Sequence, residues 1–482
     1  MKAEKYKIIT TYQKSARLDS DLSYKFFKQL IIHESYIDLL NKVSNYYQAT
    51  GQRFCTLTGP YGSGKSTFAI LLAGLLSKDK KIRSTAENTL PKRTLTKFKK
   101  AFKNEKGWLV VRIVSGGENF IFEMHKSLKS AVKEFWGNKI PKEIRNLSKP
   151  KTSNDLIKQI KKVSSQVEKS DSGVAIIFDE FGKALEDAEK NHNNIFIFQE
   201  LSEILNRADV IKKNEEQPPI LFLGILHQAI QEYAKNSSDT VKKEWDKISH
   251  RYVDLPFSLG IEEVVKLINN AIDGPEYPRN FKKTCSDTVA TLEVGRLQSM
   301  RNLDSDLAGC HPLHPITALL LGPISKRRFG QNERSTFGFL TSQEPYGFKF
   351  FLTDMIHKQE TFSPDILWDY LQQNLEPAIM LSSDGHKWSE ASISINRIKD
   401  DLIEHKKILK SISIISLFGK KYGIKANEET LVLIYGLPKK RIETILKDLV
   451  SKRSIVRKNY SNSYEIFEGS DIDLDEEIDK IK

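Results

Sequence analysis

The 482-residue chain lacks the features that mark membrane-bound, secreted or zinc-stabilised proteins. It has only three cysteines, Cys55, Cys285 and Cys310, and their wide separation gives no metal-ligand spacing. No apolar run reaches the length that a membrane span requires. The first residues, Met1 to Lys5, have no apolar core like that of a signal peptide, and the chain shows no internal repeat. We therefore expect a cytoplasmic protein with buried thiols and no membrane partner.

Charge is abundant, and its sign is unbalanced. Charged residues make up 28% of the chain and hydrophobic residues 39%, which is typical of a water-soluble globular protein. A chain of 482 residues exceeds one ordinary domain, so we expect two or three domains. The formal net charge of +13 permits contact with nucleic acid. A lysine-rich genomic composition would give the same charge, so both explanations stay open.

The most informative segment is a complete phosphate-binding loop. Residues 59–67 have the sequence Gly-Pro-Tyr-Gly-Ser-Gly-Lys-Ser-Thr, which matches G-x-x-x-x-G-K-[ST] at every fixed position. A strand pattern at 54–58 precedes the loop and an apolar helix pattern at 68–76 follows it, as this motif requires. Backbone N–H groups and the helix N-terminus then face the phosphates. The alternative is a glycine-rich turn without a ligand.

Individual residues of the loop have predicted roles. Lys65 is expected to contact the β- and γ-phosphates, and the Ser66 hydroxyl to coordinate Mg²⁺. The predicted cofactors are therefore ATP and Mg²⁺. The residues of this loop predicted to bind the nucleotide are Gly59, Pro60, Tyr61, Gly62, Ser63, Gly64, Lys65, Ser66 and Thr67.

A second segment supplies carboxylates. The apolar run at 174–178 is typical of a strand buried on both faces of a parallel sheet, and Asp179 and Glu180 end it. Ligands bind at the carboxyl ends of such strands. We expect Asp179 to hold Mg²⁺ and Glu180 to polarise the attacking water as a general base. The alternative, a solvated strand end, is disfavoured by the complete loop. The second carboxylate favours attack by water over transfer to a substrate, and no acceptor pocket of a small-molecule kinase is recognisable.

Strand and helix patterns alternate along the first half of the chain. Further strands are predicted at 108–114, 220–225 and 252–257. This alternation predicts an α/β fold with a parallel sheet covered on both faces. The expected domains are a helical lead-in at 1–50, a P-loop ATPase core at 51–260, a helical lid at 261–400, a winged helix at 401–469 and an acidic tail at 470–482.

The winged helix is predicted from three helices followed by a hairpin. Helical patterns at 403–418, 428–435 and 438–450 precede two short strands joined by a turn at 460–463. The third helix and the hairpin region are basic, which favours duplex DNA as a partner. The alternative is a solvated face of a domain that packs against the ATPase core. The basic residues are Lys439, Lys440, Arg441, Lys447, Lys452, Arg453, Arg457 and Lys458.

The order of these elements resembles an AAA+ ATPase of the origin-recognition and STAND-like branch. The segment 179–183, Asp-Glu-Phe-Gly-Lys, is similar to the acidic motif of that branch. The resemblance implies a polar sensor after the strand at 220–225, where Ile225 departs from the pattern and His227 or Gln228 must serve. It also implies that Arg251 acts as an arginine finger within a homo-oligomer. The alternative for Arg251 is a surface salt bridge.

A narrower resemblance concerns the helical region. Residues 311–315 and 329–337 are similar to segments of bacterial ATP-binding proteins associated with phage-defence islands. The predicted function is an ATP-hydrolysing switch or motor that acts on DNA in defence or DNA maintenance. The alternative function is a nucleotide-regulated scaffold whose winged helix binds a partner protein.

Overall fold

The computed structural model divides the chain into two compact units. Residues 15–258 form one unit, and residues 1–14 join residues 259–482 in the other. The finer domain boundaries predicted from the sequence remain predictions. The structure describes residues 6–9, 16–60, 62–116, 119–190, 197–198, 200–202, 219–233, 242–243, 246, 249–292, 302–327, 336–355 and 360–467.

The unit 15–258 is built on a five-stranded parallel sheet. Its strands, in order across the sheet, are β3 (Leu109–Val114), β4 (Val174–Asp179), β5 (Ile220–Leu226), β2 (Phe54–Thr58) and β6 (Val253–Pro256). Every residue of β4 and β5 is buried, as the apolar runs predict. The strand before the phosphate loop and the strand that carries the carboxylates are therefore separated by one strand. This confirms the predicted parallel-sheet, AAA+-like P-loop core.

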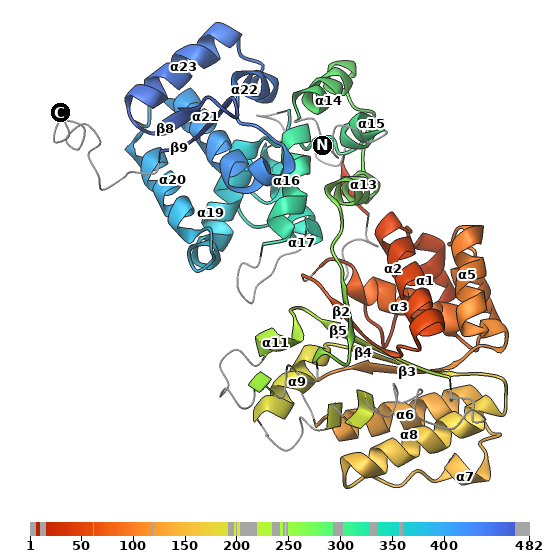
Figure 1. The fold of residues 1–482 in the computed structure, drawn as a ribbon. Helices are drawn as coiled ribbons and strands as arrows, with labels where there is room; N and C mark the ends of the chain where they lie inside the picture. The colour runs from red at the N-terminus through yellow and green to blue at the C-terminus, as the bar shows by residue number, and fades with distance from the viewer. Residues whose placement is uncertain are drawn as a thin grey trace. The chain divides into compact units, whose positions relative to one another are not determined.

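Helices cover both faces of this sheet (Figure 1). One face carries α1 (Tyr24–Gln29), α2 (Glu34–Asn45), α3 (Lys65–Leu76) and α5 (Lys92–Phe102), and the other carries α6 (Phe120–Trp136), α7 (Lys142–Arg145) and α8 (Ser153–Glu168). Helix α3 is buried on nearly all sides, whereas α6 and α8 bury one apolar stripe and expose the opposite side. A short helix, α4 (Lys80–Glu87), links α3 to α5.

The second unit is mostly helical, as predicted for residues 261–400. Strand β1 (Lys7–Ile8) pairs antiparallel with β7 (Ile272–Asp273), so the start of the chain belongs to this unit. Its larger helices are α13 (Ile261–Ala271), α14 (Arg279–Thr291), α16 (Pro315–Ser325), α19 (Pro364–Met380) and α20 (Gly385–Arg397). Residues 311–315 lead into α16, and the His314 side chain caps it by accepting from the Ile316 N–H at 3.2 Å. Most of the predicted segment 329–337 lies outside the described residues.

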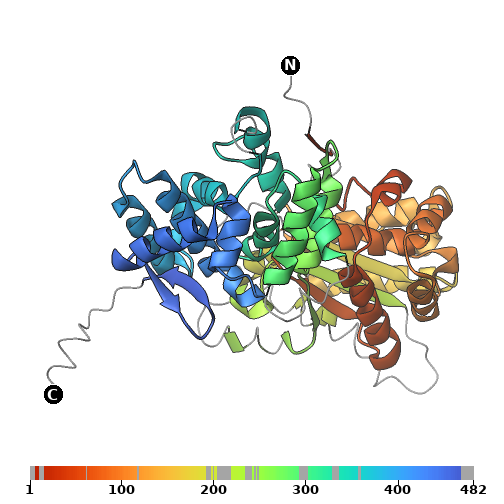
Figure 2. The ribbon, with the colours of Figure 1, turned by 90° about the horizontal axis from the view of Figure 1, so that it is seen from above.

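The last part of this unit contains three helices and a hairpin in the predicted order. They are α21 (Ile403–Ile414), α22 (Glu428–Tyr435), α23 (Lys439–Ser451) and the strands β8 (Ile455–Lys458) and β9 (Ser463–Ile466). The first helix continues as a π-helical segment, η6 (Ile415–Gly419), and a 3₁₀ turn, η7 (Lys420–Tyr422). Figure 2 shows the hairpin projecting beside these helices. The predicted acidic tail lies outside the described residues. Within the described parts of both units, no helix is long and apolar enough to cross a membrane.

Candidate functional site

The phosphate loop joins β2 to α3, and its glycines are required by the backbone. Gly62 and Gly64 adopt positive φ values of 67° and 92°, which glycine tolerates without strain. At Gly59 an added Cβ would lie 2.1 Å from the carbonyl oxygen of Phe257. These three positions therefore explain the glycines of the motif. Tyr61 lies outside the described residues.

Neighbouring strands hold the loop in place. The Gly59 N–H donates to the Leu226 carbonyl at the end of β5, at 3.2 Å. Inside the loop, the Ser63 hydroxyl donates to the Pro60 carbonyl at 2.7 Å. Lys65 is buried, and its Nζ donates to the carbonyls of Gly59 and Pro60, both at 2.6 Å. The loop thus holds the lysine ammonium within itself, where a phosphate oxygen can replace a carbonyl as acceptor.

Tyr36 of α2 supports the loop from outside, and the sequence did not indicate it. Its hydroxyl donates to the Gly64 carbonyl at 3.1 Å, at the residue that caps α3. Its ring stacks on Phe257 with centroids 5.6 Å apart and 11° between the planes. A Cβ added at Gly64 would lie 2.3 Å from the Tyr36 hydroxyl. Tyr36 therefore fixes the backbone at the point where the loop becomes a helix.

The two predicted magnesium ligands lie together. Ser66, in the first turn of α3 beside Thr67, hydrogen-bonds through its side chain to Asp179 at the end of β4. Burial raises the pKa of Asp179, and the hydrogen bond from Ser66 opposes this shift. A hydroxyl and a carboxylate are ligands that suit Mg²⁺, which keeps several of its waters. The residues present therefore fit a magnesium ion, which would favour the charged form of Asp179.

The second carboxylate is held by a histidine. The Oε1 of Glu180 lies 3.2 Å from Nε2 of His227, the residue directly after β5, and Lys183 Nζ lies 3.6 Å from Oε2. The hydrogen bond with His227 is the main reason that the pKa of Glu180 is lowered. Glu180 also adopts a positive φ of 57°, an unusual conformation for a residue with a side chain. Of the two predicted sensor residues, His227 is therefore the one in contact with the carboxylate, while Ile225 is buried in the strand.

Arg251 does not join the other predicted residues in this unit. It precedes β6, in which Val253 pairs with Cys55 and Pro256 pairs with Thr58, the last residue before the loop. At about 3.3 Å per residue, Arg251 lies roughly 15 Å from the loop along the strand direction. It is therefore near the amino end of the sheet, whereas the loop and carboxylates lie at the carboxyl end.

Comparisons with known proteins give remote similarities only. No protein-family model matches the chain, and no curated protein matches it. Among solved structures it is similar to the ORC2 protein of Aeropyrum pernix in its ADPNP–ADP complexes, with 12% identity over 95% of this chain and 97% of that one, and a TM-score of 0.35. It is also similar to the ORC1 protein of Aeropyrum pernix in complex with DNA, with 12% identity over 96% of this chain and 94% of that one, and a TM-score of 0.29. With similarities this remote, the fold assignment rests on the sheet order and the loop.

Proposed function

We propose that the protein binds ATP with Mg²⁺ and hydrolyses it, as a nucleotide-driven switch or motor. The observation that carries the proposal is the convergence of Lys65, the Ser66–Asp179 pair and Glu180 at one edge of the sheet. The remote resemblance to phage-defence ATP-binding proteins suggests a role in defence or DNA maintenance.

Each of these residues would perform a separate step. The loop N–H groups and Lys65 bind the phosphates, and Ser66 and Asp179 hold the metal ion, which offsets phosphate charge when bound. Glu180 accepts a proton from the attacking water as its oxygen bonds to the γ-phosphorus and the bond to the β-phosphate oxygen breaks. His227 and Lys183 hold the Glu180 carboxylate, so turning it toward the water requires at least one of these contacts to lengthen.

Lys65→Ala tests the nucleotide site. We expect ATP affinity to fall roughly 10- to 100-fold, because a hydrogen bond from a charged group contributes about 1.5–3 kcal/mol. Isothermal titration calorimetry with Mg·ATP measures the change. Lys158→Ala on the exposed side of α8 is the matched control and should leave affinity unchanged. Equal ATP affinity in the wild type and a folded Lys65→Ala variant would remove the phosphate role of Lys65.

We further propose that the winged helix binds duplex DNA. Helix α23 exposes Lys439, Lys440 and Lys447, and Arg457 is exposed on the hairpin. Two of the predicted basic residues instead form local ion pairs: Arg441 Nη2 lies 2.7 Å from Glu404, and Lys452 Nζ lies 2.6 Å from Asp448. The side chains that remain available for phosphates therefore lie on one stripe of α23 and on the hairpin.

Reversing Lys440, Lys447 and Arg457 to Glu is expected to weaken binding of the full chain to duplex DNA at least about tenfold at low salt, since each lost phosphate contact also lowers the salt dependence. Fluorescence anisotropy with a labelled duplex measures both effects. A folded triple variant that binds DNA as the wild type does would assign this surface to a protein partner.

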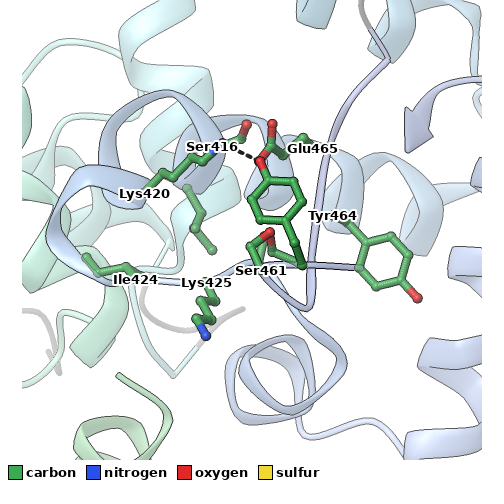
Figure 3. Close-up of a pocket in the computed structure, with 11 residues that line it drawn as sticks. Ser416, Lys420, Ile424, Lys425, Ser461, Tyr464 and Glu465 are labelled. Atoms are coloured by element: carbon green, nitrogen blue, oxygen red, sulfur yellow. Dashed lines mark hydrogen bonds and ion pairs between the residues drawn. The ribbon is translucent and has the colours of Figure 1, made fainter. Parts of the chain in front are cut away.

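The scaffold alternative has one supporting observation, a pocket beside the hairpin (Figure 3). The Lys420 Nζ–Glu465 Oε1 ion pair, 2.6 Å long, closes one side, and Tyr460 at the hairpin turn is 80% exposed. Exposed aromatic side chains next to a pocket are typical of protein interfaces. The lining residues include Ser416, Lys420, Ile424, Lys425, Ser461, Tyr464 and Glu465.

A further inference from the structure

The positive charge of the chain is concentrated in one segment of the unit 15–258. Residues 78–106 contain eleven lysines and arginines against three carboxylates, an excess of eight out of the formal net charge of +13. The segment comprises α4, α5 and the turns beside them. A uniformly lysine-rich composition would not concentrate the charge in this way, so the segment calls for its own explanation.

Some of these charges are used internally. The Arg83 guanidinium is buried and donates to the Ser77 carbonyl at 2.5 Å. Lys99 Nζ lies 2.9 Å from Glu87, and Lys106 Nζ lies 2.6 Å from Asp171. Five other basic side chains form no ion pair with any residue that the structure describes: Lys92, Arg93, Lys97, Lys100 and Lys103.

These five residues lie on one side of a firmly anchored helix. The opposite side of α5 buries Thr94, Phe98 and Phe102. The Phe102 ring lies 4.7 Å from Tyr47 and 5.5 Å from Trp108 between centroids, and the Trp108 Nε1 donates to the Phe102 carbonyl at 2.9 Å. The basic side is therefore presented to solvent by a fixed element rather than by a loose loop.

The charges of α5 oppose the stability of the helix itself. Lys92 and Arg93 stand in the first turn, where the helix dipole favours acidic residues, and the helix contains no acidic residue. Arg93 and Lys97 are four residues apart, and Lys97 and Lys100 are three apart, spacings at which like charges repel. By contrast, α8 begins with a capping box in which Asp155 accepts from Thr152 and interacts with Lys158. A bound polyanion would relieve the repulsion on α5.

We propose that the basic side of α5 binds the phosphate backbone of a nucleic acid duplex, as a second contact in addition to the winged helix. The side chains of Arg93, Lys97 and Lys100 follow successive turns of one helix face, so they can contact neighbouring phosphates. They offer no aromatic group or short polar side chain for reading bases, so the contact is independent of sequence. Each phosphate neutralised releases counterions, and this release drives the binding.

The test is reversal of Arg93, Lys97 and Lys100 to Glu in the full chain. Anisotropy with labelled duplex DNA, and with duplex RNA of the same sequence, measures affinity across a salt series. We expect binding at low salt to weaken at least about tenfold and the slope of log affinity against log salt to fall by about two to three. The two duplexes show whether the contact distinguishes DNA from RNA. The matched control reverses Lys158, Lys161 and Lys162, exposed on α8 across the sheet (Figure 1).

The outcomes separate this proposal from the winged-helix proposal. If the α5 variant binds like the wild type, or the α8 control loses as much affinity, the α5 site is wrong. If only the winged-helix variant loses binding, DNA binding stands without α5. Circular dichroism and thermal unfolding check each fold. Should the Glu variant unfold, the Gln variant at the same three positions keeps the helix propensity, and its unchanged binding would equally overturn the proposal.

Discussion

Glu180→Gln is expected to leave ATP bound and to slow its hydrolysis by about 100-fold or more, the usual contribution of a general base. The amide can still accept the hydrogen bond from His227, so the local geometry is preserved, but it cannot take the proton of the attacking water. The lowered pKa of Glu180 keeps the carboxylate deprotonated throughout the neutral range, as a base must be. Single-turnover hydrolysis and equilibrium ATP binding, measured on the same preparation, separate the two effects.

The matched control for this variant is Glu186→Gln, an exposed glutamate on the same helix, α9 (Phe181–Lys190). It changes the same charge close to the site without touching the proposed base, so its hydrolysis should equal that of the wild type. Equal rates in the wild type and Glu180→Gln would show that another group activates the water. A loss of ATP binding in Glu180→Gln would show instead that this residue stabilises the nucleotide.

The parts of the site that the sequence predicted are those encoded by neighbouring residues. The loop 59–67 and the strand ending at Asp179 each carry a local pattern, glycines at fixed offsets or a buried apolar run, which local physics turns into structure. Residue types then sufficed to predict that Ser66 and Asp179 would hold one ion.

Contacts between distant residues could not be predicted in the same way. Tyr36 meets Gly64 across 28 positions, and Arg441 meets Glu404 across 37. Nothing in the spacing of either pair marks it, because both depend on how helices pack. The partnership of His227 with Glu180 depends on β5 lying beside β4, a strand order that a chain of alternating strands and helices leaves open.

Arg251 shows what strand order adds to a sequence prediction. Because β6 runs parallel to β2, a residue before β6 lies at the far end from the loop of its own subunit. If Arg251 contacts a γ-phosphate, that phosphate must belong to a neighbouring copy. Arg251→Ala is therefore expected to retain ATP binding and to lose hydrolysis by up to about 1,000-fold, as for arginine fingers supplied in trans.

Mixing two inactive variants provides the decisive measurement. Lys65→Ala subunits cannot bind ATP well but retain Arg251, whereas Arg251→Ala subunits bind ATP but offer no finger. In a mixed assembly an intact arginine faces an intact loop, so hydrolysis should return and should rise with protein concentration. Arg145→Ala, an exposed arginine of the same unit, is the control and should be as active as the wild type. A silent mixture, together with wild-type specific activity that does not vary with concentration, would mean that each subunit hydrolyses ATP alone and that Arg251 serves only the surface of its own chain.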